Sequence, residues 1–104
     1  EIYSAALDQA EMLDDKPSIG DCLSNIGTVS LNKSEYEKSL DYYNRALKIR
    51  EELGDKWGIG VSLRDVSLCY LTKYDYDRCL QLYNSRIKYD MSRFSNRTGI
   101  FRGN

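Results

Sequence analysis

The stretch DKPSIGDCLSNIGTVSLNKSEYEKSLDYYNRALKIREELG, residues 15–54, determines the fold that is predicted for this chain, because residues 55–94 repeat it. At an offset of 40 positions, twelve of the 40 residue pairs are identical, among them Leu23/Leu63 and Tyr43/Tyr83. Two unrelated segments would match at roughly two or three positions, and self-similarity at a fixed period is the signature of a repeat array. The sequence therefore predicts a chain built from copies of one unit.

The first half of the unit is predicted to be an amphipathic helix that begins after Asp15. The Asp15 carboxylate can accept hydrogen bonds from free backbone amides, and Pro17 is tolerated in a first turn. The helix is expected to end at Leu31 or Asn32 and to bury one face, formed by Ile19, Leu23, Ile26 and Gly27. A glycine within a helix costs about 1 kcal/mol relative to alanine, so we expect a neighbouring helix to pass close to Gly27.

The second half of the unit is predicted to be a helix over residues 35–53. Ser34 and Glu37 have the spacing of a capping box, and Gly54 is suited to the left-handed conformation that ends a helix. Its apolar stripe is formed by Tyr36, Leu40, Tyr43 and Leu47. One unit is thus a helix, a tight turn and a second helix.

The second copy is expected to fold in the same way, with helices over residues 56–72 and 74–91. Tyr74 replaces Ser34, so its capping box is lost. We interpret the chain as one helical repeat domain, residues 1–104, with four parts: the second helix of a partial repeat (2–13), two repeats (15–54 and 55–94) and the start of an incomplete repeat or a frayed tail (95–104).

The arrangement of small and aromatic residues resembles the tetratricopeptide repeat, in its 40-residue variety. The resemblance covers residues 2–92 and rests on Asn25-Ile26-Gly27, on Tyr36-Glu37-Lys38-Ser39-Leu40 and on the segment from Ala46 to Asp55. It implies an all-α fold, a right-handed α-solenoid of antiparallel helix pairs, in a fragment of a longer array. The sequence departs from the tetratricopeptide motif at Arg86, where an alanine like Ala46 is expected.

The resemblance also implies a concave groove lined by the first helix of each repeat, which binds a peptide or a partner helix. An asparagine at the site of Asn25 often holds a peptide backbone in the family, while Arg64 can pair with a carboxylate. The candidate groove residues, about a third of a turn from the packing stripe, are Asp21, Ser24, Asn25, Thr28, Asn32, Val61, Arg64, Asp65, Leu68 and Thr72. The competing interpretation is that these are ordinary solvated positions of an amphipathic helix.

Composition narrows the classes of function. The 104 residues carry a net charge of −1, which gives no overall basic field for nucleic acid, and no apolar run approaches the roughly 18 residues of a membrane span. Cys22, Cys69 and Cys79 are the only cysteines and histidine is absent, so the chain alone lacks the ligands of a structural zinc site. We expect reduced thiols that serve as small buried side chains in a cytoplasmic protein.

Catalysis is not expected, because the sequence has no phosphate-binding glycine loop and no nucleophile with a recognisable base. No cofactor or metal is expected. Tyr36, Tyr43, Tyr76 and Tyr83 occupy equivalent helix-packing sites, so we interpret them as core residues. Trp57 is expected to pack against the preceding helix, the alternative being an exposed contact surface.

The leading hypothesis is a protein-interaction scaffold with a protein or peptide ligand. The alternatives are a regulatory or sensory segment of a larger signalling protein, and a spacer or self-association element. An array of two units and a leading half is short of the roughly three units that usually bury a continuous core. We therefore also expect marginal stability, or homo-oligomers that cover the terminal helices.

Overall fold

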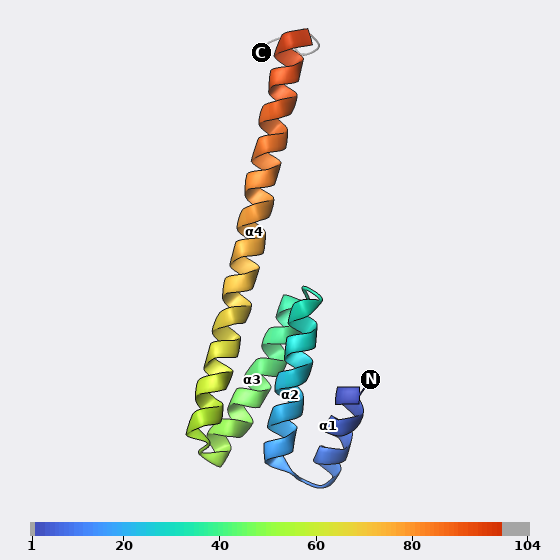
Figure 1. The fold of residues 1–104 in the computed structure, drawn as a ribbon, viewed down its shortest axis with the longest axis vertical. Helices are drawn as coiled ribbons and strands as arrows, with labels where there is room; N and C mark the ends of the chain where they lie inside the picture. The colour runs from blue at the N-terminus through green and yellow to red at the C-terminus, as the bar shows by residue number, and fades with distance from the viewer. Residues whose placement is uncertain (1, 99–104) are drawn as a thin grey trace. The chain divides into compact units, whose positions relative to one another are not determined.

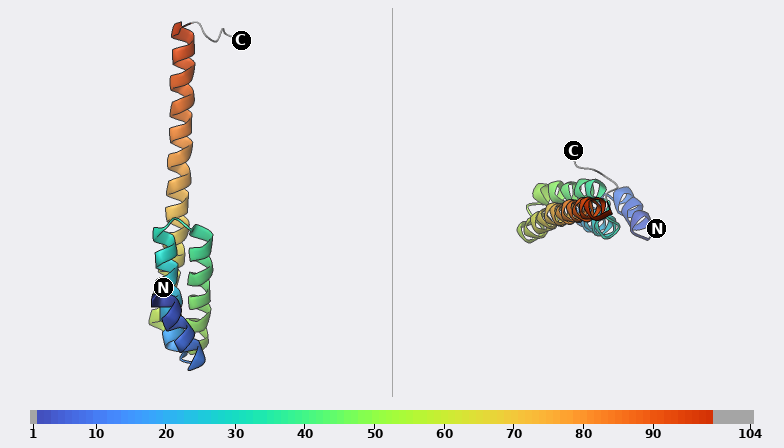
Figure 2. Two further views of the ribbon diagram at one scale, coloured as in Figure 1. Left: turned by 90° about the vertical axis from the view of Figure 1, so that its right-hand side faces the viewer. Right: turned by 90° about the horizontal axis from the view of Figure 1, so that it is seen from above.

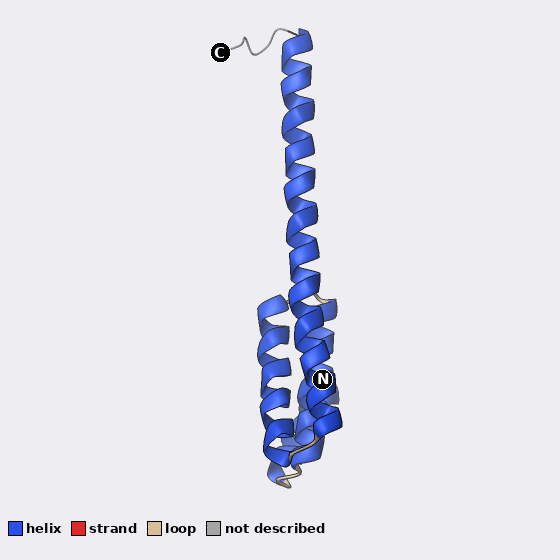
Figure 3. Cartoon of the chain, turned by 90° about the vertical axis from the view of Figure 1, so that its left-hand side faces the viewer, coloured by secondary structure: helices blue, strands red, loops and turns tan. Residues whose placement is uncertain are grey.

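The computed structural model describes the backbone of residues 2–98 and, within that range, all side chains except those of residues 89, 90 and 93–98. These residues form four α-helices joined by short turns: α1 (Ile2–Met12), α2 (Lys16–Asn32), α3 (Tyr36–Leu53) and α4 (Lys56–Thr98) (Figure 1). Only helices and loops occur in the described part of the chain (Figure 3). The predicted all-α class is confirmed, with helices that pack in the order of the sequence.

The start of α2 follows the predicted capping chemistry. The Asp15 side chain accepts a hydrogen bond from the backbone amide of Ser18 at 3.4 Å and another from the Ser18 hydroxyl at 2.7 Å. Pro17 lies in the first turn, where its missing amide hydrogen removes no helical hydrogen bond. Asp55 caps α4 in the same way, with its Oδ1 accepting from the Gly58 amide at 2.9 Å. The helix caps predicted for Asp15 and its repeat equivalent Asp55 are thus both confirmed.

The start of α3 differs from the prediction. The N-cap residue is Glu35 and makes no side-chain hydrogen bond to the helix, while Ser34 lies in the preceding turn with a φ of +62°. The capping box predicted for Ser34 and Glu37 is therefore wrong. Because the turn needs a residue in the left-handed region, Ser34 is used for its backbone conformation rather than as a cap. Gly54 ends α3 with a φ of +66°, as predicted.

The hydrophobic core lies where α2 packs against α1 and α3; in the left view of Figure 2, α1 lies in front of α2, with α3 beside them. Its fully buried members are Leu7, Leu23, Ile26 and Ala46, and Ile19 and Ile49 pack against them half-buried. The predicted packing face of α2 is confirmed: Leu23, Ile26 and Gly27 are buried, and Ile19 is half-buried.

Gly27 lets α2 and α3 approach each other closely. A Cβ atom at this position would lie 2.8 Å from the Tyr43 ring and 3.3 Å from the backbone oxygen of Ser39. The Ser39 hydroxyl donates a 2.7 Å hydrogen bond to the Gly27 carbonyl across the same contact. The close approach expected at this glycine is confirmed.

The second repeat does not form the predicted helical hairpin. We expected helices over residues 56–72 and 74–91 with a turn between them, but α4 continues without a break from Lys56 to Thr98. Tyr74 occupies the position of Ser34, and a bulky aromatic residue is costly in the left-handed region that the first turn uses. Helical backbone throughout is the conformation that this substitution favours.

The chain divides into two compact units, residues 1–73 and 74–104. In the first unit, the early turns of α4 contact both α2 and α3: the Cys69 thiol, for example, donates to the backbone oxygen of Tyr36 at 3.4 Å. In the second unit, the side chains from Tyr74 to Lys88 are all exposed. The core role predicted for Tyr76 and Tyr83 is therefore wrong in this structure.

Two further expectations, for Cys79 and Trp57, meet a different outcome. Cys79 is exposed rather than buried, and Trp57 exposes 79% of its surface instead of packing against the preceding helix. Residues 95–98 belong to α4, and the remainder of the proposed incomplete repeat, residues 99–104, lies outside the described residues.

Among the described residues, no helix is both long and apolar enough to span a bilayer.

Candidate peptide-binding surface

The candidate groove residues come from two helices that the fold brings together. The Ser24 hydroxyl on α2 donates a hydrogen bond to Oδ2 of Asp65 on α4 at 3.1 Å. The other carboxylate oxygen, Oδ1, lies 3.5 Å from Nη2 of Arg64. Only 8% of Asp65 is exposed, so its carboxylate joins the two helices and has both oxygens engaged within the chain.

Beside this contact, Arg50 of α3 forms a second polar link among three helices. Its Nη1 donates to the Ser62 hydroxyl on α4 at 2.8 Å, and its Nη2 donates to Oδ1 of Asp21 on α2 at 3.0 Å. Arg50 exposes only 7% of its surface, whereas the Asp21 side chain is mostly in solvent. A buried guanidinium requires such partners, because an uncompensated buried charge is strongly unfavourable.

Sequence reasoning missed Arg50. The available signal was its spacing, since it continues the buried stripe of Tyr43 and Ala46 at helical intervals. Asp21 was assigned to the groove, and the structure places it at the edge of this polar link.

Thr28 connects the surface to the core beneath it. Its hydroxyl donates to the backbone oxygen of Ser24 at 3.1 Å and lies 2.8 Å from the hydroxyl of Tyr43. Burial raises the pKa of the Tyr43 hydroxyl, and the hydrogen bond between this hydroxyl and that of Thr28 opposes the increase in part. Tyr43 is thus a neutral anchor for the helix that carries the candidate residues.

The remaining candidates differ in how accessible they are. Asn25, Asn32, Arg64 and Leu68 are exposed, and Val61 and Thr72 are half-buried. The accessible set combines an amide, a guanidinium and an apolar side chain, which are the groups that hold a peptide backbone, a carboxylate and an apolar side chain respectively. Asp65, Ser24, Thr28 and Asp21 use side-chain oxygens for hydrogen bonds within the fold, and of these four Asp65 is the buried one.

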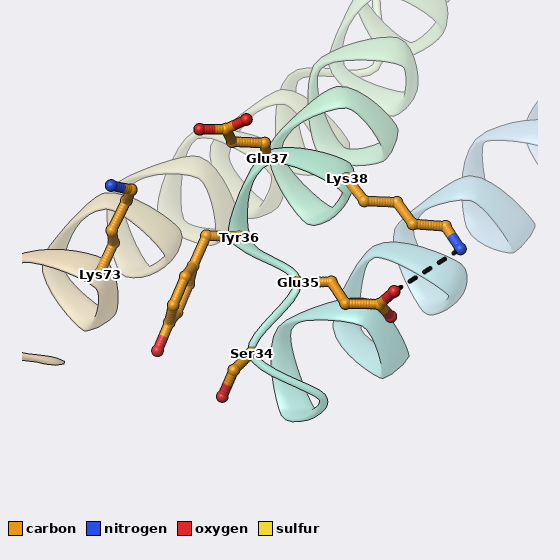
Figure 4. A pocket seen from close by; sticks show the side chains of 6 residues that line it. All are labelled: Ser34, Glu35, Tyr36, Glu37, Lys38 and Lys73. Carbon is orange, nitrogen blue, oxygen red and sulfur yellow. Dashed lines mark ion pairs between the residues drawn. The ribbon is translucent and has the colours of Figure 1, made fainter.

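A shallow pocket of about 360 Å³ lies at the turn between α2 and α3. It is lined by Ser34, Glu35, Tyr36, Glu37, Lys38 and Lys73 (Figure 4). Lys38 and Glu35 form an ion pair at 4.0 Å on one side of the turn, with Tyr36 and Lys73 on the other. The lining is charged and open, without the apolar enclosure that is usual in small-molecule sites.

No three of the described acidic or cysteine side chains come close enough together to share a metal ion. Cys22 is half-buried between α1 and α2, and burial, together with the negative charges of Asp21 and Asp15, raises the pKa of its thiol. A raised pKa reduces the thiolate fraction and therefore the nucleophilicity of this cysteine.

Comparison of the chain with models of protein families, with curated proteins and with solved structures gives no match in any of the three.

Proposed function

We propose that this chain is a segment of a tetratricopeptide-type solenoid that binds an extended peptide or a partner helix. The binding wall in this proposal is α2 together with the early turns of α4. The supporting observation is the Ser24–Asp65 hydrogen bond of 3.1 Å, which joins α2 to α4 at positions adjacent in sequence to the exposed residues Asn25 and Arg64.

The chemistry of this surface favours a peptide ligand. Asn25 offers both a donor and an acceptor to a peptide backbone, Arg64 offers a bidentate donor to a carboxylate, and Leu68 adds an apolar contact. The net charge of −1 provides little attraction for a phosphate backbone. We therefore propose a cytoplasmic scaffold that acts through protein partners and has no catalytic role of its own.

The test is a screen of the purified chain against an array of linear peptides, followed by titration of the best binder. We expect Asn25→Ala and Arg64→Ala each to weaken binding about tenfold, the equivalent of roughly 1.4 kcal/mol, and Asn25→Ala to do so without a change in melting temperature.

The matched controls are Asn44→Ala and Arg45→Ala, which remove the same side chains from exposed positions of α3. They should leave the dissociation constant unchanged. The proposal fails if no peptide binds, or if the α3 variants weaken binding as much as the α2 and α4 variants do.

A further inference from the structure

The packing of α3 on α2 provides a template for the second repeat. In the first repeat, Leu23 and Tyr43 expose only 1% and 2% of their surfaces, and Ser39 donates to the Gly27 carbonyl where the helices cross. The equivalent residues of the second repeat are Leu63, Tyr83, Cys79 and Ser67. The sequence of α4 thus contains both partners of an interface that the same chain forms elsewhere.

Neither partner is covered in α4. Leu63 exposes 51% of its surface and Tyr83 exposes 64%, and Ser67 and Cys79 are also exposed. The helix has no turn between the two partners, and two stretches of one uninterrupted α-helix cannot face each other. Within the described residues, these positions in both halves of the second repeat are therefore uncovered.

We propose that two copies of this chain exchange the second half of α4. Residues 74–91 of each copy pack on residues 56–72 of the other, in the way that α3 packs on α2. The occupant is a second copy because these residues match the sequence of α3, which is the helix that covers the equivalent surface in the first repeat. The exchange is reciprocal, so the dimer is closed and has two-fold symmetry.

Two substitutions set the geometry of the exchanged contact. Ser67 replaces Gly27, so the helices cross at a wider separation than in the first repeat, where a Cβ would meet the Tyr43 ring at 2.8 Å. Arg86 replaces the fully buried Ala46, and its aliphatic stem can lie on the apolar surface while its charged end reaches solvent. The exchanged contact is therefore looser than the α2–α3 contact that it copies.

The first experiment combines mass measurement with a single cysteine substitution. Light scattering of the native chain should give about twice the 12.0 kDa of one copy. In Ser67→Cys, mild oxidation should link residue 67 of one copy to the native Cys79 of the other, giving a dimer on a non-reducing gel. Ser67→Cys combined with Cys79→Ser is the control and should not give this dimer.

Peptide mapping of the oxidised Ser67→Cys chain separates the possible occupants. A 67–79 link between two chains supports the exchange. The same link within one chain would show that the second repeat closes as a hairpin, and absence of the link from a chain of single-copy mass would show that the second half of α4 is not exchanged; either result overturns the proposal.

A second pair of variants tests the interface without a cross-link. Tyr83→Asp places a charge at the equivalent of the buried Tyr43 and should shift the mass to that of one copy. Asn84→Asp adds a negative charge at the adjacent position, equivalent to the exposed Asn44, and should leave the dimer intact. Equal masses for the two variants would contradict the exchange.

Peptide binding by Asn25 and Arg64 is measured in a separate experiment, so the exchange and the peptide-binding proposal can each fail alone.

Discussion

At the residue scale, single side chains determine how closely the helices pack. Gly27 is the clearest case, because its missing Cβ leaves room for the Tyr43 ring. Gly60, by contrast, lies in an exposed part of α4, and a Cβ there would meet nothing within 4 Å. The structure thus gives a packing reason for Gly27 and none for Gly60.

Substitution of both glycines by alanine should therefore have opposite effects. We expect Gly27→Ala to lower the free energy of unfolding by about 1–3 kcal/mol, since the added methyl group overpacks the α2–α3 contact. Gly60→Ala should raise it by up to about 1 kcal/mol, because alanine is the better helix former. Urea unfolding followed by circular dichroism measures both, and a stabilising Gly27→Ala would contradict the close contact.

Arg50 is the second residue whose role depends on its surroundings. Arg50→Ala should lower the free energy of unfolding by about 2–3 kcal/mol, because it removes charged hydrogen bonds to Asp21 and Ser62 from a buried position. The control is Arg45→Ala, whose ion pair with Asp41 is exposed and 4.0 Å long. Pairs of that kind contribute about 0–1 kcal/mol. Equal effects of the two variants on the urea midpoint would show that the Arg50 link contributes little.

The pKa shifts of Cys22 and Tyr43 predict how stability depends on pH. Both groups are neutral acids whose pKa is raised in the folded chain, from ordinary values of 9.0 and 10.0 respectively. As the pH rises above 9.0, the unfolded chain loses these protons before the folded chain does, so the free energy of unfolding falls. The stabilisation is fully present at neutral pH.

Thermal unfolding between about pH 7 and pH 11 tests this dependence. The melting temperature should be constant near neutral pH and fall above it, and Cys22→Ala should make the fall between pH 9 and pH 10 shallower. A fall that is unchanged in Cys22→Ala would show that other groups cause it.

At the scale of the element, the two repeats differ most at the turn between their helices. The first repeat turns at Ser34, which adopts a φ of +62°, and the second continues as helix through Tyr74. Similar sequences thus adopt a hairpin in one copy and a single helix in the other.

Tyr74→Gly should restore the turn. Glycine adopts positive φ without steric cost and is about 1 kcal/mol less favourable than alanine within a helix. When Tyr74→Gly is combined with Ser67→Cys, we expect the 67–79 disulfide to form within one chain, and the mass to be that of one copy. Gln81→Gly weakens the same helix away from the turn and is the control. An identical cross-link pattern in both glycine variants would show that residue 74 does not select the conformation.

At the scale of the whole molecule, the described buried contacts are concentrated in residues 1–73. The core residues Leu7, Leu23, Ile26 and Ala46 belong to this unit, as do both partners of the Arg50 link. The second unit, from Tyr74 onward, has exposed side chains throughout its described part. The two units should therefore differ in their ability to fold alone.

Truncation tests this division. A chain that ends at Lys73 should remain helical, unfold cooperatively and have the mass of a single copy, because it keeps the described core. A chain that ends at Gly54 should be much less stable, since it loses Ser62, Asp65 and Cys69, all of which contact α2 or α3. Circular dichroism melts compare the two, and an unfolded 1–73 chain would contradict an independent first unit.

Much of the fold was predictable from local sequence. The 40-residue period, the aspartate caps, Gly54 and the apolar stripes predicted α1, α2 and α3 and the buried face of α2. For the candidate site, the sequence selected a surface whose two helices do meet, through Ser24 and Asp65. These features follow from backbone hydrogen bonding and helical periodicity, which act over a few residues.

The sequence by itself thus determined that the chain is helical, the bounds of α1, α2 and α3 to within about one residue, and which face of α2 is buried. Only the tertiary structure decided that α4 is one helix, that Arg50 is buried among three helices and that Asp65 is engaged within the fold. The physical reason is the separation along the chain over which each kind of interaction acts. Caps and periodicity are local, whereas the choice between a turn and a continuous helix at Tyr74, and the partner of each polar group, depend on what distant surfaces are available to bury.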